Sequence, residues 1–412
     1  MEFIADFHIH SKYSRATSRD MDIAHITEWA KLKGITLMGT GDFTHHLWLE
    51  ELKHTLEDCG NGLYHYNGVY FILTAEVSSI YSKQGKTYRI HNLIFSPSFK
   101  TTDKINEKLS RIGNLASDGR PILGLDAAEL ARTVFDIDED CMIIPGHIWT
   151  PWFSLFGSMS GFDRIEDCFE EQTAKIFALE TGLSSDPAMN WRLSALDKFT
   201  LISNSDSHSP QKIGREANVF SCELDYQTIR EVLRTKDKNR FLYTIEFFPE
   251  EGKYHFDGHR LCNINWSPKE TREHGGKCTK CGKPVTVGVV NRVEKLADRP
   301  TGFKPDNAIP FKNLIPLEEI IADAKGVGKA SIAVERDYYS CLAKFGTEFE
   351  ILMRAPKQDL MQGLPPKVAE GVLRVREGKV NIKAGYDGEY GVISIFGDEE
   401  ISPKNEQQLS LF

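Results

Sequence analysis

The chain has 412 residues, of which 41% are hydrophobic and 26% are charged, a globular composition that excludes disorder over most of its length. No apolar run approaches the roughly 18 residues of a membrane span, and Asp6 and His8 interrupt the N-terminus too early for a signal peptide, so we expect a cytoplasmic protein without a membrane partner. The length suits two or three domains.

The formal charge of -9 is unevenly distributed. Residues 1–251 hold 26 Lys and Arg against 37 Asp and Glu, a balance of -11, whereas residues 252–395 hold 23 against 18, a balance of +5. The remaining 17 residues hold one Lys and four acidic residues, a balance of -3. An acidic first part fits a site that concentrates cations, and a basic second part fits contact with a polyanion.

Residues 1–235 alternate strand-like and helix-like runs, which favours an α/β fold with a mainly parallel sheet. Helix-like runs include Asp22–Lys33 and Asp163–Lys175. The strand-like runs are Glu2–Phe7, Ile35–Gly39, Phe71–Ala75, Tyr88–Phe95, Met142–Pro145 and Phe199–Asn204.

The rest of the chain changes in character. A polar boundary at 236–260 leads into a small unit rich in Cys and His at about 255–290. Residues 315–380 are expected to be mostly helical, with Gly and Pro punctuation at Gly363–Pro366. The acidic, aperiodic segment from 397 onward is predicted to be a disordered tail.

Histidines and acidic residues recur at the ends of the predicted strands. In DFHIHS, His8 and His10 are two residues apart, so both side chains point to one side of an extended chain. Other apolar runs end in or carry Asp42, His45, Glu76, His91, His147, Asp206 and His208. In a barrel of alternating strands and helices the C-terminal strand ends converge on one face. Imidazole and carboxylate together suit Zn, Mn or Fe, so the pattern predicts a metal cluster.

These elements resemble the PHP (polymerase and histidinol phosphatase) metallophosphoesterases in DFHIHS, GTGDF, HNL, PGH and SNSDSH. The resemblance implies an irregular seven-stranded β/α barrel that holds two or three divalent ions (Zn, Mn, Mg or Fe). It places His8, His10 and Asp206 at the first ion, His91 and His147 at the second, Glu76 between the two, Asp42 within the cluster and His208 at a third ion. Glu76, Asp206 and His208 are its implied catalytic residues.

Two positions depart from that family pattern. Where the family often has Thr-Asp-His, this chain has Gly41-Asp42-Phe43, which leaves His45 as an alternative ligand. A further His that often follows the first motif is replaced here by Ser14, Arg15 and Ala16. Both departures leave open whether the cluster holds two or three ions.

A closer similarity, to the bacterial branch of the endonuclease Q family, spans nearly the whole chain. It rests on HIWTPWFS (147–154), ALETGLSSDPAMNWRLS (178–194), KIGREANVF (212–220), KYHFDGHRLC (253–262) and CGKPVTVGVVNRVEKLADR (281–299). The resemblance implies a DNA repair endonuclease that cuts 5′ of deaminated bases (uracil, hypoxanthine, xanthine) and abasic sites. It also implies a barrel over 1–240, a zinc-binding module over 253–295 and a mostly helical DNA-binding region over 296–396.

Aromatic and basic residues in these stretches are candidates for nucleic-acid contact. Trp149, Trp152 and Phe153 directly follow His147, and an enzyme that acts on one base of a duplex usually extrudes that base and stacks it. Trp191, Arg192 and Arg215 lie in the other distinctive stretches, and Arg15 is a further candidate for orienting the phosphate. Loop packing, or a solvated surface position for the arginines, remains the alternative for each.

A second metal site is predicted from cysteine spacing. His259-x-x-Cys262 and Cys278-x-x-Cys281 form two ligand pairs separated by a loop, which can close a tetrahedral structural zinc site. His255 and His274 are alternatives to His259 as the fourth ligand.

The chain ends in Gln408, Leu409, Ser410, Leu411 and Phe412. This pentapeptide matches the bacterial sliding-clamp motif Gln-Leu-(Ser/Asp)-Leu-Phe, in which apolar side chains on a flexible tail dock into a pocket. We therefore expect a clamp-binding tail over 397–412, with docking of this terminus on its own protein as the alternative.

The pattern as a whole favours a nucleoid-associated nuclease. A PHP-type phosphatase of small phosphomonoesters and a non-catalytic DNA-binding scaffold are the two rivals. A helicase is disfavoured, because Gly326-Val327-Gly328-Lys329 lacks the spacing of a phosphate-binding loop.

Overall fold

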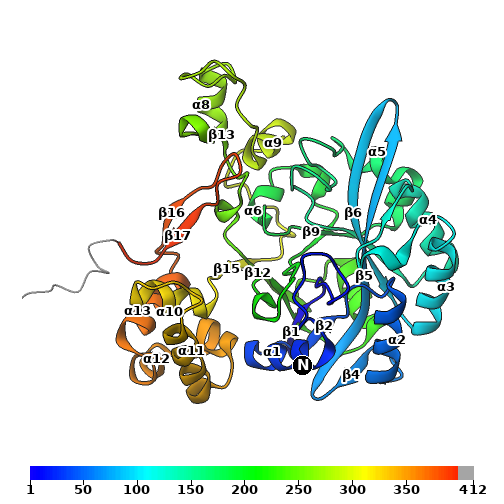
Figure 1. Ribbon diagram of the computed structural model, residues 1–412, viewed down its shortest axis with the longest axis horizontal. Coiled ribbons are helices and arrows are strands. Elements are labelled where there is room, and N and C mark those ends of the chain that lie inside the picture. The colour runs from blue at the N-terminus through cyan, green and yellow to red at the C-terminus, as the bar shows by residue number, and fades with distance from the viewer. Residues whose placement is uncertain (398–412) are drawn as a thin grey trace, which may run out of the picture.

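A large mixed sheet forms the centre of the protein, whose computed structural model describes residues 1–397 (Figure 1). Its strands follow the order β15-β12-β11-β1-β2-β5-β4-β3, with β6 paired to β5 and β8, and β7 paired to β5. The strands are β1 (Glu2–Asp6), β2 (Leu37–Gly39), β3 (Glu57–Asp58), β4 (Tyr64–Tyr66), β5 (Val69–Lys83), β6 (Lys86–Ser96), β7 (Ile122–Leu123), β8 (Met142–Pro145), β11 (Ala217–Ser221), β12 (Phe241–Glu246) and β15 (Phe311–Asn313). A separate parallel pair joins β9 (Ala178–Glu180) to β10 (Thr200–Ile202).

The prediction of an α/β fold is confirmed, but that of a mainly parallel sheet is wrong. Strands β1, β2 and β5 are parallel neighbours, whereas β1 pairs antiparallel with β11, and β6 pairs antiparallel with both β5 and β8. The long ribbon of β5 and β6 turns at Gln84 and Gly85, both with positive φ. A two-residue turn of this kind can connect only antiparallel strands.

Side chains from strands across the sheet meet in one buried apolar cluster. Its members on strands include Phe3, Ala5, Leu37, Ile72, Leu93, Phe95, Met142, Ile144, Ala178, Ile202, Phe220 and Phe241. A second, larger cluster packs helices onto the outer faces of these strands and extends into the C-terminal helices. The strands therefore surround a common interior, and closure into a seven-stranded barrel stays a prediction.

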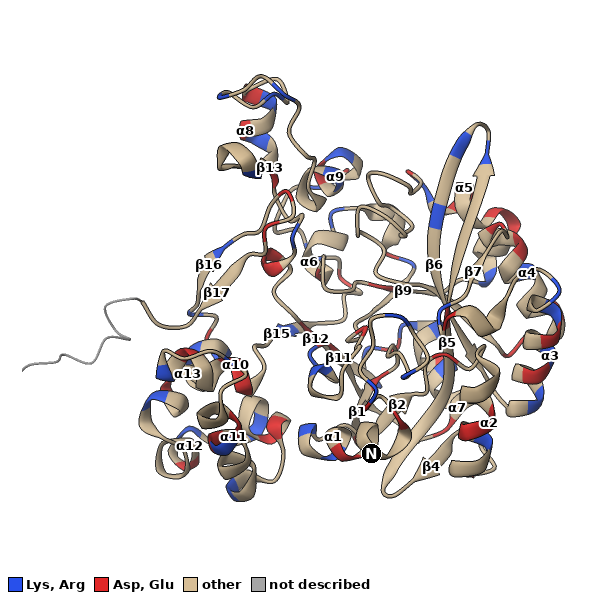
Figure 2. Cartoon of the chain, in the orientation of Figure 1, with Lys and Arg blue, Asp and Glu red and all other residues tan. Residues whose placement is uncertain are grey.

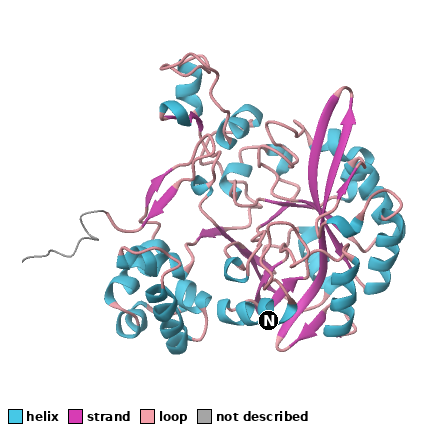
Figure 3. Ribbon diagram, viewed as in Figure 1, coloured by secondary structure: helices cyan, strands magenta, loops and turns pink. Residues whose placement is uncertain are grey.

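Helices cover the sheet on its outer side (Figure 3). They are α1 (Ile23–Lys33), α2 (His46–Thr55), α3 (Phe99–Leu109), α4 (Ala127–Ile137), α5 (Ile165–Phe169), α6 (Pro187–Asn190) and α7 (Tyr226–Thr235). The helix expected over 163–175 is interrupted, because α5 ends where Glu170 takes a φ of 49° and a 3₁₀ turn follows.

Two further parts follow the sheet in the chain. A small arm holds β13 (Asp257–His259), β14 (Ile264–Trp266), α8 (Pro268–Glu273) and α9 (Val289–Leu296). A group of helices follows, with α10 (Leu317–Lys325), α11 (Ile332–Phe345), α12 (Lys357–Gly363) and α13 (Pro366–Arg376), and a hairpin of β16 (Asn381–Lys383) and β17 (Val392–Ser394) lies between this group and the arm (Figure 1). The predicted domain boundaries remain predictions, and Gln408–Phe412 lies outside the described residues.

One buried ion pair ties the C-terminal helices to the sheet. Lys33, at the end of α1, lies 2.7 Å from Glu348, and both side chains are only 3% exposed. The same carboxylate accepts hydrogen bonds from the Tyr338 hydroxyl and from the backbone N–H of Leu317. Because a buried charge is costly without its partner, this contact fixes how the two parts sit against each other. Across the described residues, no helix is long and apolar enough to cross a membrane.

Candidate active site

The ends of β1 and β10 bring two histidines beside an aspartate. After β1 the chain stays extended, and the backbone N–H of His10 donates to the carbonyl oxygen of Ser207 at 2.9 Å. This bridge lays His8 and His10 along the loop that carries Asp206. His10 Nε2 lies 3.2 Å from Asp206 Oδ1, although the two residues are far apart in the chain.

Strand β5 supplies the carboxylate that these histidines face. Glu76 is fully buried, and its Oε2 atom lies 3.1 Å from His10 Nε2 and 3.4 Å from His8 Nε2. One ligand atom from each of His8, His10, Glu76 and Asp206 falls within 4.8 Å of the others. These four residues form group 1.

The other oxygen of Glu76 faces a second group. Glu76 pairs with Leu93 across the β5–β6 ribbon, so His91, two residues along β6, is its diagonal neighbour on the same face. Glu76 Oε1 lies 2.5 Å from His91 Nδ1 and 3.1 Å from His147 Nε2, which follows β8. Glu76, His91 and His147 form group 2, so one buried carboxylate is shared between two groups.

The unsatisfied atoms of these side chains fit divalent cations. His8 Nε2, His10 Nε2 and Asp206 Oδ1 are buried, and although they lie close to one another and to Glu76, their contacts lack hydrogen-bond geometry among the described residues. Buried polar atoms are almost always hydrogen-bonded, so three orphans that converge on one point need an explanation. Imidazole nitrogen and carboxylate oxygen are the usual ligands of Zn, Mn and Fe, and a cation in each group would satisfy these atoms.

Two carboxylates that make no part of these groups orient the histidines. Glu180 Oε1 lies 3.0 Å from His8 Nδ1, and Glu180 also accepts from Asn204 Nδ2 and from the backbone N–H of His147. Asp42 holds His10 Nδ1 at 3.0 Å. Fixing one ring nitrogen in this way aims the other at the pocket, the usual arrangement around metal-binding histidines.

Among residues 1–397, Asp42 joins neither group, so its role as a ligand stays a prediction. Its Oδ1 atom lies against His10 Nδ1, and its Oδ2 atom accepts from the backbone N–H and hydroxyl of Ser11 and from the hydroxyl of Ser14. Sequence reasoning missed Glu180, although Glu180 ends strand β9 and thus repeats the pattern of an acidic residue at a strand end. It also missed Arg120, whose Nη1 lies 3.2 Å from Glu76 Oε2.

Burial and neighbouring charges shift the pKa values of the site residues in opposite directions. Burial alone would lower the pKa of His8, but the carboxylates of Glu180 and Glu76 raise it well above 6.5, and Asp42 does the same for His10. Burial alone would raise the pKa of Glu76, yet the surrounding imidazoles and a guanidinium lower it well below its ordinary range. Burial lowers the pKa of His91 to about 4, so this ring is neutral at pH 7 and its lone pair is available.

The backbone is strained where it presents these side chains. His147 has a φ of 29°, Asp206 a φ of 46° and Asp42 a φ of 49°. Residues other than glycine adopt this region rarely and at a cost of roughly 1–3 kcal/mol each, and such strain is concentrated at functional sites. The packing around the groups therefore holds the chain in a conformation that the local sequence alone would not favour.

The two remaining predicted histidines lie beside the groups. The His208 ring lies 4.5 Å from that of His10, and its Nδ1 is 2.9 Å from the carbonyl oxygen of Asp206, but within residues 1–397 it joins neither group. His45 stacks on Tyr13 instead. The described residues thus offer two cation groups, and the predicted third ion stays a prediction.

The aromatic and basic candidates divide into internal and exposed residues. Trp149 is buried and donates to Asn190, Trp191 packs edge-on against Phe311, and Arg192 binds Glu294, so these three make internal contacts. Trp152 is 37% exposed. Phe153 lies against the His91 ring, with ring centroids 4.9 Å apart.

A cleft of about 680 Å³ lies between the loop after His147, the segment before the arm and the C-terminal helices, and none of its lining residues belongs to group 1 or group 2. Trp152, Tyr254 and Tyr390 contribute aromatic surface, and Arg215 and Lys253 contribute positive charge. Lys212 and Lys329 also line the cleft, but both are paired with Glu319, another lining residue. Arg215 also donates to the carbonyl oxygens of Ser205 and Asp206, which links the cleft to the loop of group 1. The cleft combines aromatic and cationic surface, as nucleotide-binding grooves do.

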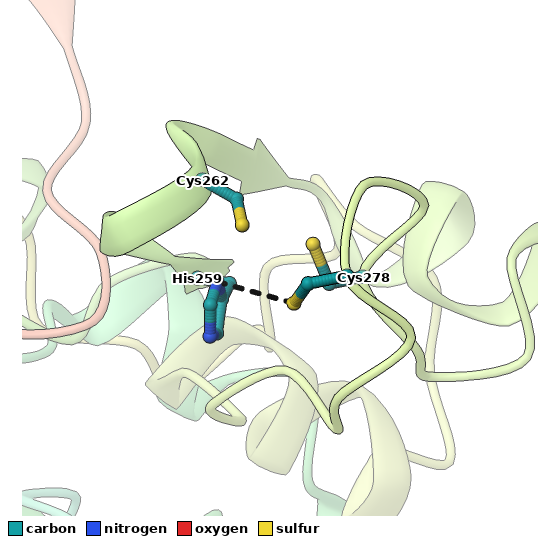
Figure 4. A group of neighbouring side chains, drawn as sticks. His259, Cys262 and Cys278 are labelled. Carbon is teal, nitrogen blue, oxygen red and sulfur yellow. Dashed lines mark hydrogen bonds between the residues drawn. The ribbon is translucent and has the colours of Figure 1, made fainter.

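Four ligands also converge in the arm. His259, Cys262, Cys278 and Cys281 place one ligand atom each within 4.8 Å of one another. His259 comes from the end of β13, Cys262 from the helical turn that follows it and Cys278 from the loop after α8 (Figure 4). Of the alternative ligands, His255 is buried elsewhere and His274 stacks on Trp266. Cys281 Sγ lies 3.9 Å from His259 Nδ1, which favours His259 as the fourth member.

Comparisons with known proteins find similarity over nearly the full length of the chain. A family model described as the MJ0043 C-terminal domain matches residues 316–379. The structure of the lesion-specific endonuclease PfuEndoQ from Pyrococcus furiosus is 34% identical, with a TM-score of 0.87 over 98% of this chain and 98% of that one. An endonuclease Q in complex with a 27-mer duplex that has an abasic lesion at the active site is 33% identical, with a TM-score of 0.85 over 98% and 99% of the two chains.

A curated relative is matched only in part. An uncharacterized protein of Methanocaldococcus jannaschii is 34% identical over 256 residues, which make up 60% of this chain. The match covers 31% of that protein's length, so most of that protein has no counterpart in the aligned region.

Replacing an anionic member of group 1 or group 2 should weaken the binding of divalent metal. We expect Asp206→Asn and Glu76→Gln to lose bound divalent metal, by more than the roughly 10–100-fold in affinity that changes in supporting residues cost. Metal content after dialysis, measured by mass spectrometry, checks this, with Glu50→Gln on the exposed face of α2 as the control. Wild-type metal content in both variants would mean that the cations bind elsewhere.

Metal affinity should rise with pH. Because the pKa values of His8, His10 and His147 are raised above 6.5 without metal, a cation must displace their protons. Each displaced proton weakens binding by up to about tenfold per pH unit below the raised pKa, so affinity should climb from pH 6.5 upward. Competition with a fluorescent chelator at pH 6, 7 and 8 measures this, and an affinity independent of pH would contradict it.

Proposed function

The chain belongs to the endonuclease Q family, and on this premise we propose that it is a DNA repair endonuclease that cuts one strand 5′ of deaminated bases (uracil, hypoxanthine or xanthine) and abasic sites. Family members are nucleases, so the chain is a hydrolase. The observation that supports the reaction most strongly is the sharing of buried Glu76 between group 1 and group 2. Two cations so placed suit in-line attack on a phosphodiester.

The chain's own residues would divide the work. Divalent cations held by the two groups would lower the pKa of bound water and neutralise the negative charge that builds up on the phosphate. Glu180 and Asp42 hold the rings of His8 and His10 with Nε2 toward the pocket. His208 donates from Nδ1 to the Asp206 carbonyl oxygen, which leaves Nε2 free to accept a proton. Burial, then nearby His10, lowers the pKa of His208, so its neutral ring suits that role.

The cleft of Trp152, Tyr254 and Tyr390 is the proposed site of the extruded nucleotide. Trp152 and Tyr254 lie edge to face at 5.3 Å, and Lys253 lies 4.4 Å from the centre of the Tyr390 ring. Aromatic faces accept any base, and cations pair with the backbone phosphates. A damaged or mispaired base costs less to unstack, which would give selectivity before any hydrogen bond to the base forms.

The arm and the C-terminal helices are proposed to hold the DNA. Lys and Arg are distributed over the arm around α8 and on β16 (Figure 2), in the part of the chain with a balance of +5. We propose a structural Zn at His259, Cys262, Cys278 and Cys281, since Cys and His in a closed set of four favour zinc. The domain division of 1–240, 253–295 and 296–396 and a nucleoid-associated, cytoplasmic location belong to the same proposal.

We also propose that the terminal Gln408–Phe412 binds a bacterial sliding clamp. The support is the match of the pentapeptide to the clamp motif. Such a tether would raise the local concentration of the enzyme on DNA without touching the chemistry.

Nicking should be specific in position. On end-labelled duplexes with one uracil, hypoxanthine, xanthine or abasic site, we expect a single cut 5′ of the lesion that leaves the base attached, because activated water attacks phosphorus. Product mapping on a denaturing gel checks this, with an undamaged duplex and Asp206→Asn as controls. Release of free uracil, a cut only on the 3′ side, or turnover of histidinol phosphate with inert DNA would each contradict the proposal.

Replacing one cysteine of the group in the arm should release its zinc. Cys278→Ser should reduce bound zinc by about one ion and lower the melting temperature, because a small metal module has little core of its own. Metal analysis and a thermal scan test this against Cys59→Ser, an exposed thiol outside the group. Equal zinc content in the two variants would refute the assignment.

Deleting Gln408–Phe412 should abolish clamp binding and leave nicking of short oligonucleotides unchanged, since the tail is proposed as a tether. Surface plasmon resonance with immobilised clamp gives the affinity, and a chain with these five residues scrambled is the matched control. If the shortened chain binds the clamp as well as the full chain does, the motif is coincidental.

A further inference from the structure

We propose that Arg120 is a catalytic residue that donates hydrogen bonds to a non-bridging oxygen of the phosphate being cut. This inference rests on the proposed function, because it concerns the phosphodiester at the same site. Arg120 lies on the loop between α3 and β7.

The guanidinium of Arg120 reaches the centre of the site. Its Nη1 atom lies 3.2 Å from Glu76 Oε2, the same oxygen that faces His8 and His10 in group 1. An arginine guanidinium stays charged in proteins whatever its surroundings. A fixed positive charge therefore lies beside the position where an anionic phosphate would meet the two groups.

The loop that carries Arg120 is built into the site rather than laid over it. Gly119 donates to the carbonyl oxygen of Tyr13 and accepts from Thr44, and Pro121 accepts from Ser78, two residues beyond Glu76. A Cβ atom on Gly119 would come within 2.3 Å of Asp42 Oδ2 and 2.4 Å of Ser14 Oγ. Only glycine fits this close approach, and it fixes the neighbouring Arg120 relative to the supports of His10.

Most of the hydrogen-bonding capacity of Arg120 remains for a ligand. The side chain is 28% exposed, and among residues 1–397 its one partner is Glu76, through Nη1. A guanidinium has five N–H donors in a planar fork. It can therefore keep one donor on Glu76 and present its other edge to phosphate oxygens, for which it is the preferred side chain.

The other arginines considered from the sequence are placed differently. Arg15 is 78% exposed and pairs with Asp118. Arg192 is bound to Glu294, and Arg215 donates to two backbone carbonyl oxygens. Of these arginines and Arg120, only Arg120 contacts a side chain of group 1 or group 2, whereas Arg215 reaches only the backbone of Asp206.

The test must separate contact with phosphate from support of Glu76. We expect Arg120→Ala and Arg120→Gln to lower kcat on an abasic-site duplex by about 10²–10³-fold, the range seen when one donor to a developing charge is removed. Metal content should equal that of wild type, and affinity for the same duplex in EDTA should change less than about threefold. Arg111→Ala, an exposed residue just after the end of α3, is the matched control for loss of one positive charge.

A sulfur substitution tests the contact itself. A single phosphorothioate at the cut position, as each separate stereoisomer, should slow wild-type enzyme, and one isomer should slow Arg120→Ala several-fold less, because the lost contact no longer counts. An unchanged effect of both isomers in Arg120→Ala, a kcat within threefold of wild type, or loss of bound metal would overturn the proposal.

A small diester separates this inference from the proposed function. The same variants are assayed on bis(p-nitrophenyl) phosphate, which needs no lesion recognition. Cleavage of this diester with the Arg120 dependence intact, but no cutting of damaged DNA, would remove the proposed function and keep the role of Arg120. Wild-type protein that cleaves neither substrate would overturn both.

Discussion

The carboxylate of Glu76 is the constraint around which the site is arranged. It is fully buried on strand β5, where an isolated charge would be prohibitively costly. Imidazoles of His8, His10, His91 and His147 surround it within 3.4 Å, and Arg120 completes the ring. Neutralising one buried carboxylate therefore brings side chains from β6 and from the segments after β1, β8 and α3 to the same place.

The same electrostatics leave the site prepared for cations. Protonated His8 and His10 compensate the carboxylates in the metal-free protein, and their Nδ1 atoms are already held by Glu180 and Asp42. A divalent cation can replace these protons without movement of the supports, because the rings are aimed before it arrives. The strained backbone at His147 and Asp206 is consistent with such preorganisation.

The cleft depends on contacts far from the metal groups. Its walls come from the loop after His147, from the segment before the arm and from the C-terminal helices. The buried pair of Lys33 and Glu348 holds those helices against α1. The walls of the cleft are therefore held in place partly by an ion pair that is itself buried. The TM-score of 0.87 to PfuEndoQ over 98% of both chains shows that the overall fold is shared with that protein.

The sequence by itself determined the residue types and their local order. His8, His10, Glu76, His91, His147 and Asp206 could be predicted because each lies in or just after a strand-like run, where the period of the chain decides which way a side chain points. The family resemblance, now confirmed, came from the same motifs. Cys262, Cys278 and Cys281 also lie close together in the sequence, so their spacing alone was enough to predict the group in the arm.

Only the tertiary structure decided which of these residues belong to the two groups and which orient the members of those groups. Asp42 and Glu76 are both acidic residues at strand-like runs, yet Asp42 is held by Ser11 and Ser14 behind His10, and Glu76 lies between the two groups. Arg120 enters the site through a loop that carries no motif of its own, and Glu180 lies in the distinctive stretch 178–194, which does not by itself indicate its contact with His8. The mixed strand order was likewise hidden, because local periodicity reports the direction of a side chain but not the strand beside it. Long-range packing fixes these choices, and no short stretch of sequence contains both partners of such a contact.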